Sequence, residues 1–452
     1  MTHHLFRGGC HPPENKDATK DLELRPAKTP AIVAVSFSQH IGKPSTPMIK
    51  AGERVLRGQL IAEPQGFVSA PAHASVSGTV KGVVQLRHPL GFLVDALKIE
   101  NDNKDEWHPD ANREEDPDTL SPDEIRSRIQ KAGIVGMGGA TFPTHVKLSP
   151  PKGKTMDTLV LNGAECEPYL TADDRLMTER PETIIRGAEL IAKAVGASKI
   201  LVGIENNKPR AIGTMRDAAA KLGGRVEIRS LPVMYPQGAE KQLIYATLNR
   251  TVPSGGLPMD VGVLVHNVAT AYAAYEACRY NRPLTERVVT ITGPGVRKPA
   301  NLWVRIGTMA KDLLDECEFD YQGTKKLICG GPMMGMPMRD LEWATTKGGN
   351  GILCLTDPAA YAHDPCIRCG RCVDACPMGL LPCSLSNYGE ANLLAEAEDI
   401  NARDCIECGC CSYVCPSKRP IVQWVRMEKA EINRKAQLAA AAAAAKAAEA
   451  AK

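Results

Sequence analysis

The chain has 452 residues, a formal net charge of +3 and 24% charged residues. This length allows several hydrophobic cores, and we expect three or more domains. The nearly balanced charge provides no strong field for nucleic acid, and no apolar run of about 18 residues predicts a transmembrane helix. The N-terminus lacks the apolar core of a signal peptide. The 16 cysteines are therefore expected in a reducing compartment.

The first hundred residues contain an extension and a β-rich segment. Residues 1–30 show no hydrophobic period, and we expect an N-terminal extension that is loop-like. In residues 31–100, short β-rich runs alternate with Gly and Pro, which predicts a small β domain. This stretch resembles a lipoyl-type barrel-sandwich hybrid, but its hairpin tip at residues 71–75 has no Lys to be modified. We expect a structural or docking module in which His73 is a solvated turn residue rather than a ligand. The expected strands lie at residues 31–35, 55, 60–62, 67–69, 76, 79–84 and 93–99.

An acidic stretch with prolines follows. Residues 101–120 are expected to form a linker whose carboxylates are solvated. Ser121 and Glu124 then make the capping box of a helix. This helix should run to about Lys131 and end at Gly133.

Residues 155–250, within an expected domain at residues 121–285, have a βα rhythm. Strands that alternate with helices predict a parallel sheet with helices on its faces, a Rossmann-like domain. The expected strands lie at residues 158–161, 199–204 and 226–231, and the expected helices at residues 182–195, 209–222, 239–248 and 266–280. Residues 286–352 return to short strands, with one at 288–292 and a helix at 309–314. They resemble the β-grasp module called a soluble-ligand-binding (SLBB) domain.

A Gly-rich segment, residues 133–147, precedes the first of these strands. Closely spaced glycines let the backbone approach a phosphate, a following helix would supply N–H donors, and Lys147 would add a positive charge. The segment lacks a preceding strand and the Rossmann spacing, so by itself an ordinary turn explains it better. However, Asn162, Glu165 and Glu167 follow at the end of a predicted strand, where parallel sheets bind ligands. Taken together, the two segments favour a flavin and nucleotide site over two polar turns.

Two cysteine runs, each closed by Pro, lie near the C-terminus. They are Cys366, Cys369, Cys372 and Cys376, then Cys405, Cys408, Cys411 and Cys415. This is the spacing of bacterial two-cluster ferredoxins, in which the fourth cysteine ligates the other cluster. We therefore expect one 4Fe–4S cluster on Cys366, Cys369, Cys372 and Cys415, and a second on Cys405, Cys408, Cys411 and Cys376. Zinc sites use spaced pairs of ligands and disulfide frameworks suit short secreted chains, so both alternatives rank lower. Cys410 is expected to be a spare thiol.

Residues 353–425 form the expected cluster domain, with a helix at about 387–399 between the motifs. The tail, residues 426–452, is rich in Ala, which favours a helix. It has no stripe of large apolar residues, so we expect a solvated helix or a frayed end.

These three motifs occur in the same order in the C subunits of Rnf ion-translocating electron-transport complexes, and the chain resembles that family. Its middle part is also similar to the NADH-binding flavoprotein subunit of respiratory complex I. The resemblance implies a multidomain α/β protein with barrel-sandwich hybrid, Rossmann-like FMN/NADH, β-grasp and two-cluster ferredoxin-like helical domains. It places Phe142 on the nicotinamide nucleotide and Lys147 on FMN. The cofactor-binding residues that it implies are Gly136, Gly138, Gly139, Ala140, Phe142, Lys147, Asn162, Glu165, Glu167, Gly238, Glu240 and Asn267. The chain departs from the complex I pattern at Ala164, Cys166 and Ala239, which replace Asp, Gly and Glu.

The resemblance implies the electron-input subunit of an ion-translocating NADH:ferredoxin oxidoreductase, in which electrons pass between NADH, FMN and two 4Fe–4S clusters. No side chain is expected to act as a general acid or base. The implied partners are integral membrane and iron–sulfur subunits, with ferredoxin as the eventual electron partner and no nucleic acid. The implied location is peripheral, on the cytoplasmic side of the cell inner membrane. Three alternatives remain: a soluble flavin and iron–sulfur reductase similar to cobalamin reductases, a flavin-free electron conduit, and a zinc-bearing scaffold. Ala164 and Ala239 keep the second of these open.

Overall fold

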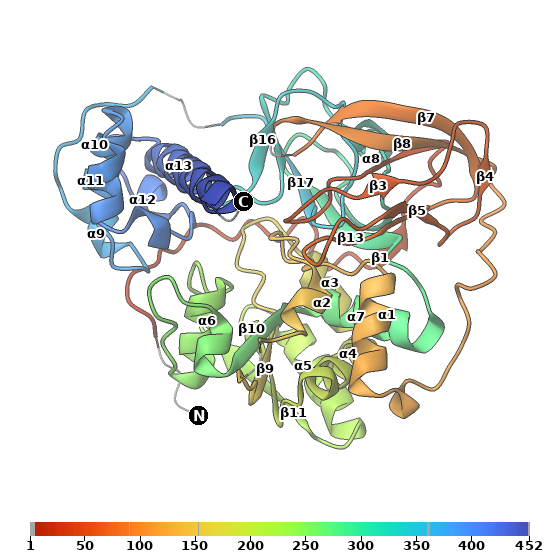
Figure 1. Cartoon of the computed structure of the whole chain (residues 1–452). Coiled ribbons are helices and arrows are strands. Elements are labelled where there is room, and N and C mark those ends of the chain that lie inside the picture. The colour runs from red at the N-terminus through yellow and green to blue at the C-terminus, as the bar shows by residue number, and fades with distance from the viewer. Residues whose placement is uncertain (1–4, 90, 152, 359–361, 451–452) are drawn as a thin grey trace.

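The computed structural model describes residues 5–89, 91–151, 153–358 and 362–450. Its strands form four sheets, and a group of helices carries the cysteine motifs (Figure 1). The first four residues of the expected extension, on which the signal-peptide argument partly rests, lie outside the described residues, as do the last two of the tail. Within the described part of the chain, none of the helices has both the length and the apolar character needed to span a bilayer.

Residues 32–101 form two small antiparallel sheets, with the orders β2-β8-β7-β4 and β3-β5-β6. The strands are β2 Ile32–Ser36, β3 Thr46–Pro47, β4 Arg54–Val55, β5 Leu60–Glu63, β6 Ala72–His73, β7 Gly78–Arg87 and β8 Leu93–Asn101. The strands expected at residues 67–69 and at Val76 are wrong, because Phe67 and Val76 lie in bends. Phe67 has no sheet partner to cover it and is 57% exposed.

The hairpin tip of this small β domain is buried, so the prediction of a solvated His73 is wrong. His73 is 6% exposed, and burial lowers the pKa of its imidazole to about 3. The tip lies against the start of the Gly-rich segment. The ammonium of Lys347 joins the two, because it donates hydrogen bonds of 2.7 Å to the carbonyls of both Pro71 and Gly133. This side of the small β domain therefore packs within the chain.

A four-stranded parallel sheet with the order β11-β10-β9-β12 forms the centre of the next domain. Its strands are β9 Thr158–Asn162, β10 Lys199–Glu205, β11 Val226–Leu231 and β12 Val263–Asn267. Its helices are α1 Pro122–Lys131, α2 Thr144–Lys147, α3 Ala172–Glu179, α4 Pro181–Val195, α5 Pro209–Lys221, α6 Glu240–Leu248 and α7 Val268–Tyr280. The predicted parallel sheet is thus confirmed. The helix expected to begin at His266 begins at Val268 instead, because the preceding residues pair with β9 as strand β12.

The third sheet has six strands in the order β1-β14-β13-β17-β15-β16. Its elements are β1 Leu24–Pro26, β13 Glu286–Thr292, β14 Ala300–Arg305, β15 Lys326–Cys329, β16 Met336–Met338 and β17 Gly351–Leu355, with α8 Ala310–Glu316. Strand β13 pairs antiparallel with β14 and parallel with β17. The N-terminal extension supplies β1, which pairs parallel with β14, so the extension is not a loop throughout.

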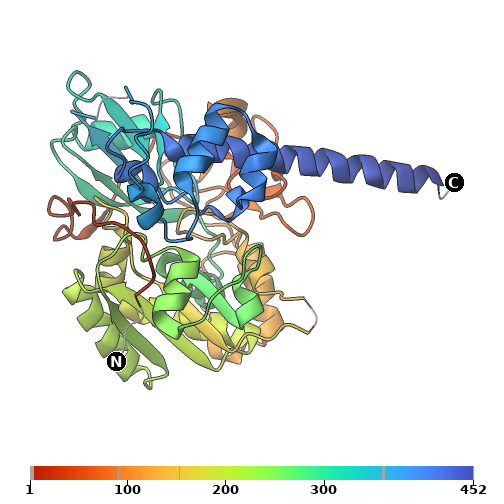
Figure 2. The same ribbon diagram turned by 90° about the vertical axis from the view of Figure 1, so that its left-hand side faces the viewer.

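The cysteine motifs lie among short helices. These are α9 Arg371–Asp374, α10 Pro382–Glu390, α11 Leu394–Asp399 and α12 Cys410–Tyr413, followed by the long α13 Ile421–Ala450. The single helix expected at 387–399 is split, because Asn392 has a left-handed φ of 55°. The tail packs further than expected, since Ile432 is 3% exposed. Residues 433–440 are exposed, and the rest of α13 projects from the body of the molecule (Figure 2).

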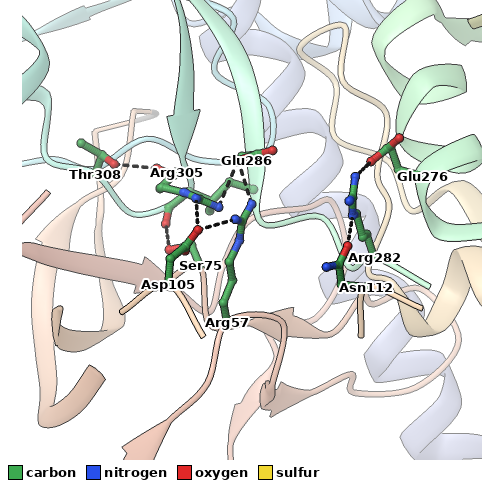
Figure 3. Close-up of polar contacts among 10 residues, drawn as sticks. Arg57, Ser75, Asp105, Asn112, Glu276, Arg282, Glu286, Arg305 and Thr308 are labelled. Atoms are coloured by element: carbon green, nitrogen blue, oxygen red, sulfur yellow. Dashed lines mark hydrogen bonds and ion pairs between the residues drawn. The ribbon is translucent and has the colours of Figure 1, made fainter. Parts of the chain in front are cut away.

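The acidic linker is paired rather than simply solvated, contrary to expectation. Asp105 lies 2.9 Å from both Arg57 and Arg305, and the same arginines lie 2.9 and 3.1 Å from Glu286. Figure 3 shows this network at the start of β13 and the end of β14. The side chain of Arg57 is only 8% exposed, so its charge needs these partners. The network therefore joins the small β domain and the linker to the six-stranded sheet.

Candidate functional site

The Gly-rich loop ends in an exposed tip. The N–H of Gly136 donates to the carbonyl of Phe142 at 2.9 Å, and the N–H of Thr141 donates to the carbonyl of Gly136 at 3.2 Å. These bonds close the loop and leave residues 138–140 at the surface. Gly139 has a φ of +107°, and nothing lies within 4 Å of the place where a Cβ would stand. The tip is therefore a left-handed turn that a ligand can approach closely.

The helix after the loop, α2, is a single turn of four residues. So short a helix offers only a weak N-terminal dipole, and phosphate binding at this place stays a prediction. Lys147 ends this turn, and its ammonium lies 2.8 Å from Glu240 Oε1 and donates to the carbonyl of Val265 at 3.1 Å. The side chains of Lys147 and Glu240 are 30% and 39% exposed. The structure thus brings together two of the residues expected to bind cofactor, at a place that solvent reaches.

Asn162 and Asn267 end the neighbouring strands β9 and β12 and lie opposite each other in the register. Asn162 Nδ2 donates to the carbonyl of Gly238 at 2.7 Å. Asn267 Oδ1 accepts from the N–H of Ala269 at 2.8 Å and caps α7. A Cβ on Gly138 would stand 3.4 Å from the Cβ of Asn267. Four residues from distant segments therefore meet at the carboxyl edge of the parallel sheet, where such sheets bind ligands. We call this place the flavin edge, after the cofactor that the resemblance implies for these residues, and binding of FMN here stays a prediction.

Glu165 and Glu167, in the turn after β9, accept hydrogen bonds from backbone groups. Glu165 accepts from the N–H groups of residues 173–174 at the start of α3, at 2.7 and 3.1 Å. Glu167 accepts from the N–H groups of residues 333–334, at 3.1 and 2.8 Å. The turn is therefore held on one side by α3 and on the other by the loop between β15 and β16. Contacts of these carboxylates with ribose hydroxyls stay a prediction.

Buried acids lie beneath this turn. Asp173 is 7% exposed, and burial, followed by the charge of Glu165, raises its pKa. The same two causes raise the pKa of Asp174 to about 6. Asp173 Oδ2 accepts from Asn267 Nδ2 at 2.7 Å. A carboxyl group that holds a proton more readily than usual therefore lies directly behind the flavin edge.

Four buried polar atoms, in the Gly-rich segment and next to Gly238 and Asn267, have no hydrogen-bond partner among the described residues. They are Thr144 Oγ1, His145 Nδ1, Gln237 Nε2 and His266 Nε2. Gln237 precedes Gly238 and His266 precedes Asn267 along the chain. A buried polar atom without a partner is costly, so such atoms point to a bound group. The open tip of the Gly-rich loop leaves room for a ligand, and these atoms could form hydrogen bonds with it. The flavin edge therefore fits a polar cofactor such as FMN.

The helical domain holds two cavities, each lined by four of the predicted cluster ligands. The first is lined by Cys366, Cys369, Cys372 and Cys415, with Cys383 of α10 beside them. The second is lined by Cys405, Cys408, Cys411 and Cys376, with Cys410 beside them. Each cavity thus combines three cysteines of one motif with the fourth cysteine of the other. No three His, Cys, Asp or Glu side chains in the described ranges converge closely enough for a single ion. Each cavity is therefore a candidate site for a polynuclear cluster, and the role of these thiols as ligands stays a prediction.

The two cysteine motifs have the same backbone conformation. Arg368 and Glu407, at matching positions, have φ of 55° and 58°, and Gly370 and Gly409 have φ of 79° and 85°. A short helix follows in each motif, α9 and α12. Backbone N–H groups donate to Cys376 Sγ and Cys405 Sγ, both at 3.4 Å. Such bonds stabilise negative charge on sulfur, as a cluster ligand requires.

Two contacts of the turn after β9 were not predicted. The hydroxyl of Tyr235 donates to the carbonyl of Cys408 at 2.7 Å and lies 3.4 Å from Glu167 Oε1. The buried ammonium of Lys16 donates to carbonyls of the turn after β9. Tyr235 lies in an irregular stretch and Lys16 in a polar run without a period. No local pattern in the sequence distinguishes either residue.

Comparison with known proteins gives three matching family models and many relatives. Residues 4–104 match the RnfC barrel sandwich hybrid domain, residues 129–276 the Nuo51 FMN-binding domain and residues 365–418 the 4Fe-4S dicluster domain. The C subunit of the proton-translocating ferredoxin:NAD(+) oxidoreductase complex of Clostridium ljungdahlii is 47% identical over 94% of this chain and 93% of its own. The C subunit of the Na(+)-translocating complex of Acetobacterium woodii is 45% identical over 96% of this chain and 98% of its own. The C subunit of the ion-translocating oxidoreductase complex of Rhodobacter capsulatus is 42% identical over 95% of this chain and 83% of its own.

Proposed function

Because the chain belongs to the family of C subunits of ion-translocating ferredoxin:NAD(+) oxidoreductase complexes, we propose that it is the electron-input subunit of such a complex. In this role it exchanges electrons with NADH and passes them through FMN and two 4Fe–4S clusters to a partner subunit. The matched models name both cofactors, an FMN-binding domain and a 4Fe-4S dicluster domain. The observation that carries the proposal is that Tyr235 joins the turn after β9, which follows Asn162 of the flavin edge along the chain, to a cavity lined by four cysteines.

FMN, when bound, supplies the exchange between the hydride chemistry of nicotinamide and the one-electron chemistry of the clusters. The chain's own residues bind and orient. We assign Phe142 and the exposed tip of the Gly-rich loop to close approach by the cofactor and the nucleotide. Lys147 would face negative charge, and the backbone and amide groups at Asn162, Gly238 and Asn267 would fix a polar ring edge. The orphaned atoms beside these residues support the assignment.

We further propose an order for the two clusters. The cluster held by Cys376, Cys405, Cys408 and Cys411 would accept electrons first, because Tyr235 connects the Cys408 carbonyl with the turn after β9. The cluster in the other cavity would then pass the electrons to a partner subunit. Its binding loop is at the surface, where Ile367 is 66% exposed and Cys369 is also exposed. A partner subunit would dock there.

The proposed domains follow the sheets. The order β14-β13-β17-β15, with a central parallel pair, supports a β-grasp (SLBB) module, and the parallel sheet supports a Rossmann-like FMN/NADH domain. The proposed units are residues 1–30 extension, 31–100 barrel-sandwich hybrid, 101–120 linker, 121–285 FMN/NADH domain, 286–352 β-grasp, 353–425 two-cluster domain and 426–452 tail.

We also propose peripheral attachment on the cytoplasmic side of the inner membrane, through integral and iron–sulfur subunits, with ferredoxin as the eventual electron partner. The names of the relatives, which describe ion-translocating ferredoxin:NAD(+) oxidoreductase complexes, support this. Fractionation of the native host tests it. We expect most of the chain to stay on washed membranes. Release of most of it would favour the soluble reductase alternative.

Cofactor analysis of the anaerobically purified chain tests the proposed function itself. We expect one FMN and about eight iron atoms per chain, four for each cluster. Iron with no flavin would favour the flavin-free conduit. Zinc in place of iron and sulfide would contradict the proposal altogether.

A further inference from the structure

The N-terminal extension reaches from the second cysteine cavity to the turn after β9. In Figure 1 it passes between the helical domain and the domain of the parallel sheet. Gly9 N donates to the carbonyl of Ala375 at 3.0 Å. Gly8 lies so close to Cys376 that a Cβ would stand 2.7 Å from its backbone carbon. This end of the extension therefore packs on the backbone that carries a predicted ligand of the second cluster.

The next residue, Cys10, continues this contact. It forms an antiparallel bridge with Tyr235, with N–H···O distances of 2.8 and 3.0 Å. Its Sγ lies 3.4 Å from the Sγ of Cys410. Tyr235 is the residue whose hydroxyl meets the Cys408 carbonyl. The extension is thus fastened to the same residue that joins the second cavity to the turn after β9.

At its other end, the extension contacts the turn after β9 through Lys16. This lysine is 6% exposed, and its ammonium donates to the carbonyls of Glu165 at 3.0 Å, Glu167 at 2.9 Å and also Leu170. An ammonium has three protons, so all of its donors are used on one turn. Burial, followed by the charge of Lys208, lowers its pKa. A buried amine is costly, and its three hydrogen bonds to carbonyls offset part of this cost.

We propose that Lys16 is a positioning residue for the flavin edge. Its ammonium gathers three carbonyls of the turn after β9, and through residues 8–16 it holds this turn at a fixed place relative to the second cysteine cavity. The inference rests on the proposed function, in which that turn belongs to the FMN site and that cavity holds the first electron acceptor. The ammonium also places a positive charge beside Glu165 and Glu205. It therefore compensates negative charge behind the cofactor.

The test compares three variants of the full chain with clusters in place. Lys16→Met removes the three bonds and the charge, and Lys16→Arg keeps the charge and several donors. Lys20→Met is the matched control, because Lys20 lies in the same segment and its side chain is 46% exposed. The first readout, taken without flavin, is amide hydrogen exchange in residues 163–170. We expect faster exchange in Lys16→Met only, with the iron content unchanged.

The second readout is FMN binding and the potential of the bound flavin. In Lys16→Met we expect FMN to bind roughly tenfold more weakly, with a flavin midpoint potential shifted to more negative values. Lys16→Arg should restore the potential and part of the affinity. If Lys16→Met fails to fold, Lys16→Arg decides. The proposal predicts that Lys16→Arg folds and binds FMN more weakly than Lys20→Met does. Exchange, affinity and potential equal to those of Lys20→Met would overturn the proposal. If the wild-type chain binds no FMN, the proposed function fails, while the exchange data still decide the role of Lys16 in holding the turn.

Discussion

The hydroxyl of Tyr235 donates a hydrogen bond of 2.7 Å to the carbonyl of Cys408. The same hydroxyl lies 3.4 Å from Glu167 Oε1. Burial, followed by the charge of Glu167, raises the pKa of this phenol, so it remains a neutral donor. One buried side chain thus contacts both the second cysteine motif and the turn after β9. The route proposed for electrons crosses the molecule at this contact.

Tyr235→Phe tests the contact. The change leaves the Cys408 carbonyl without its donor, and an unsatisfied buried group costs about 1–3 kcal/mol. We expect a lower midpoint temperature of anaerobic unfolding and faster loss of iron to a chelator. Tyr413→Phe is the control, because Tyr413 is 48% exposed and surface changes stay within about 0.5 kcal/mol. Equal behaviour of the two variants would show that the hydroxyl bond contributes nothing.

Paired cysteine variants test the exchange of the fourth ligand between the motifs. If Cys366 and Cys415 serve one cluster, Cys366→Ser with Cys415→Ser removes one cluster, and about half of the iron remains. Cys366→Ser with Cys376→Ser removes ligands from both clusters, and little iron remains. Iron analysis and electron paramagnetic resonance distinguish these outcomes. The reverse pattern would mean that each motif holds its own cluster.

The non-ligand cysteines provide the controls for that experiment. Cys383 lies beside the first cavity and Cys410 beside the second. We expect Cys383→Ser and Cys410→Ala to keep both clusters. Loss of a cluster in either variant would mean that the ligand sets are assigned wrongly.

Lys147 variants test the assignment of the Gly-rich loop. Removing a positive charge that faces the cofactor should weaken FMN binding by roughly tenfold in Lys147→Met, about 1.4 kcal/mol, and Lys147→Glu should abolish it. The iron content should not change.

FMN fluorescence titration of the flavin-free chain measures these affinities. Lys154→Met is the matched control, since Lys154 pairs with Asp260 at the surface and is 45% exposed. Unchanged FMN affinity in Lys147→Glu would show that the loop does not form the flavin site.

Glu428 on α13 should make stability depend on pH. It is 1% exposed, and both carboxylate oxygens lack a partner among the described residues. Burial raises its pKa from 4.5 to about 7. The unfolded chain therefore releases this proton at lower pH than the folded chain, and the stability contributed by the protonated form is lost as the pH rises between these values. Above about pH 7 Glu428 is ionised in both the folded and the unfolded chain, and the cost of burying its carboxylate no longer changes with pH.

We expect Glu428→Met to raise the free energy of unfolding by about 1–3 kcal/mol above neutral pH, with a smaller gain at about pH 6. Thermal unfolding under anaerobic conditions at two pH values measures the difference. Glu431→Met is a control on the same helix, because the side chain of Glu431 is 33% exposed and pairs with Arg434. A gain that is the same at both pH values would contradict the assignment of the penalty to ionisation.

The elements that sequence reasoning predicted well carry their own local determinants. Helix α4 ends where expected because Gly196 takes a φ of 74° there, and α1 begins at the predicted capping box. Strand β12 was missed because its apolar run merges with an Ala-rich helix, and only pairing with β9 separates the two. The predicted cysteine sets line two separate cavities, and the spacing that repeats in both motifs is a local feature of the sequence.

Contacts between segments far apart in sequence could not be predicted. Lys16 meets its carbonyl partners about 150 residues away, and no composition or period marks it. Asp105 was expected to be solvated because its partners, Arg57 and Arg305, come from two other domains. His73 is buried close to Lys131 at the end of α1 and to Lys347, which both lie outside the small β domain. In each case the determinant is tertiary, and a single sequence does not display it.

Rapid mixing of the FMN-loaded, cluster-loaded chain with NADH, followed by freeze-quench spectroscopy, tests the central claim most directly. The account predicts that flavin absorbance bleaches first, and that the cluster on Cys376, Cys405, Cys408 and Cys411 is reduced before the one on Cys366, Cys369, Cys372 and Cys415. Variants that keep only one cluster assign the signals. Cluster reduction by dithionite but not by NADH, in a chain that holds its full flavin and iron, would contradict it.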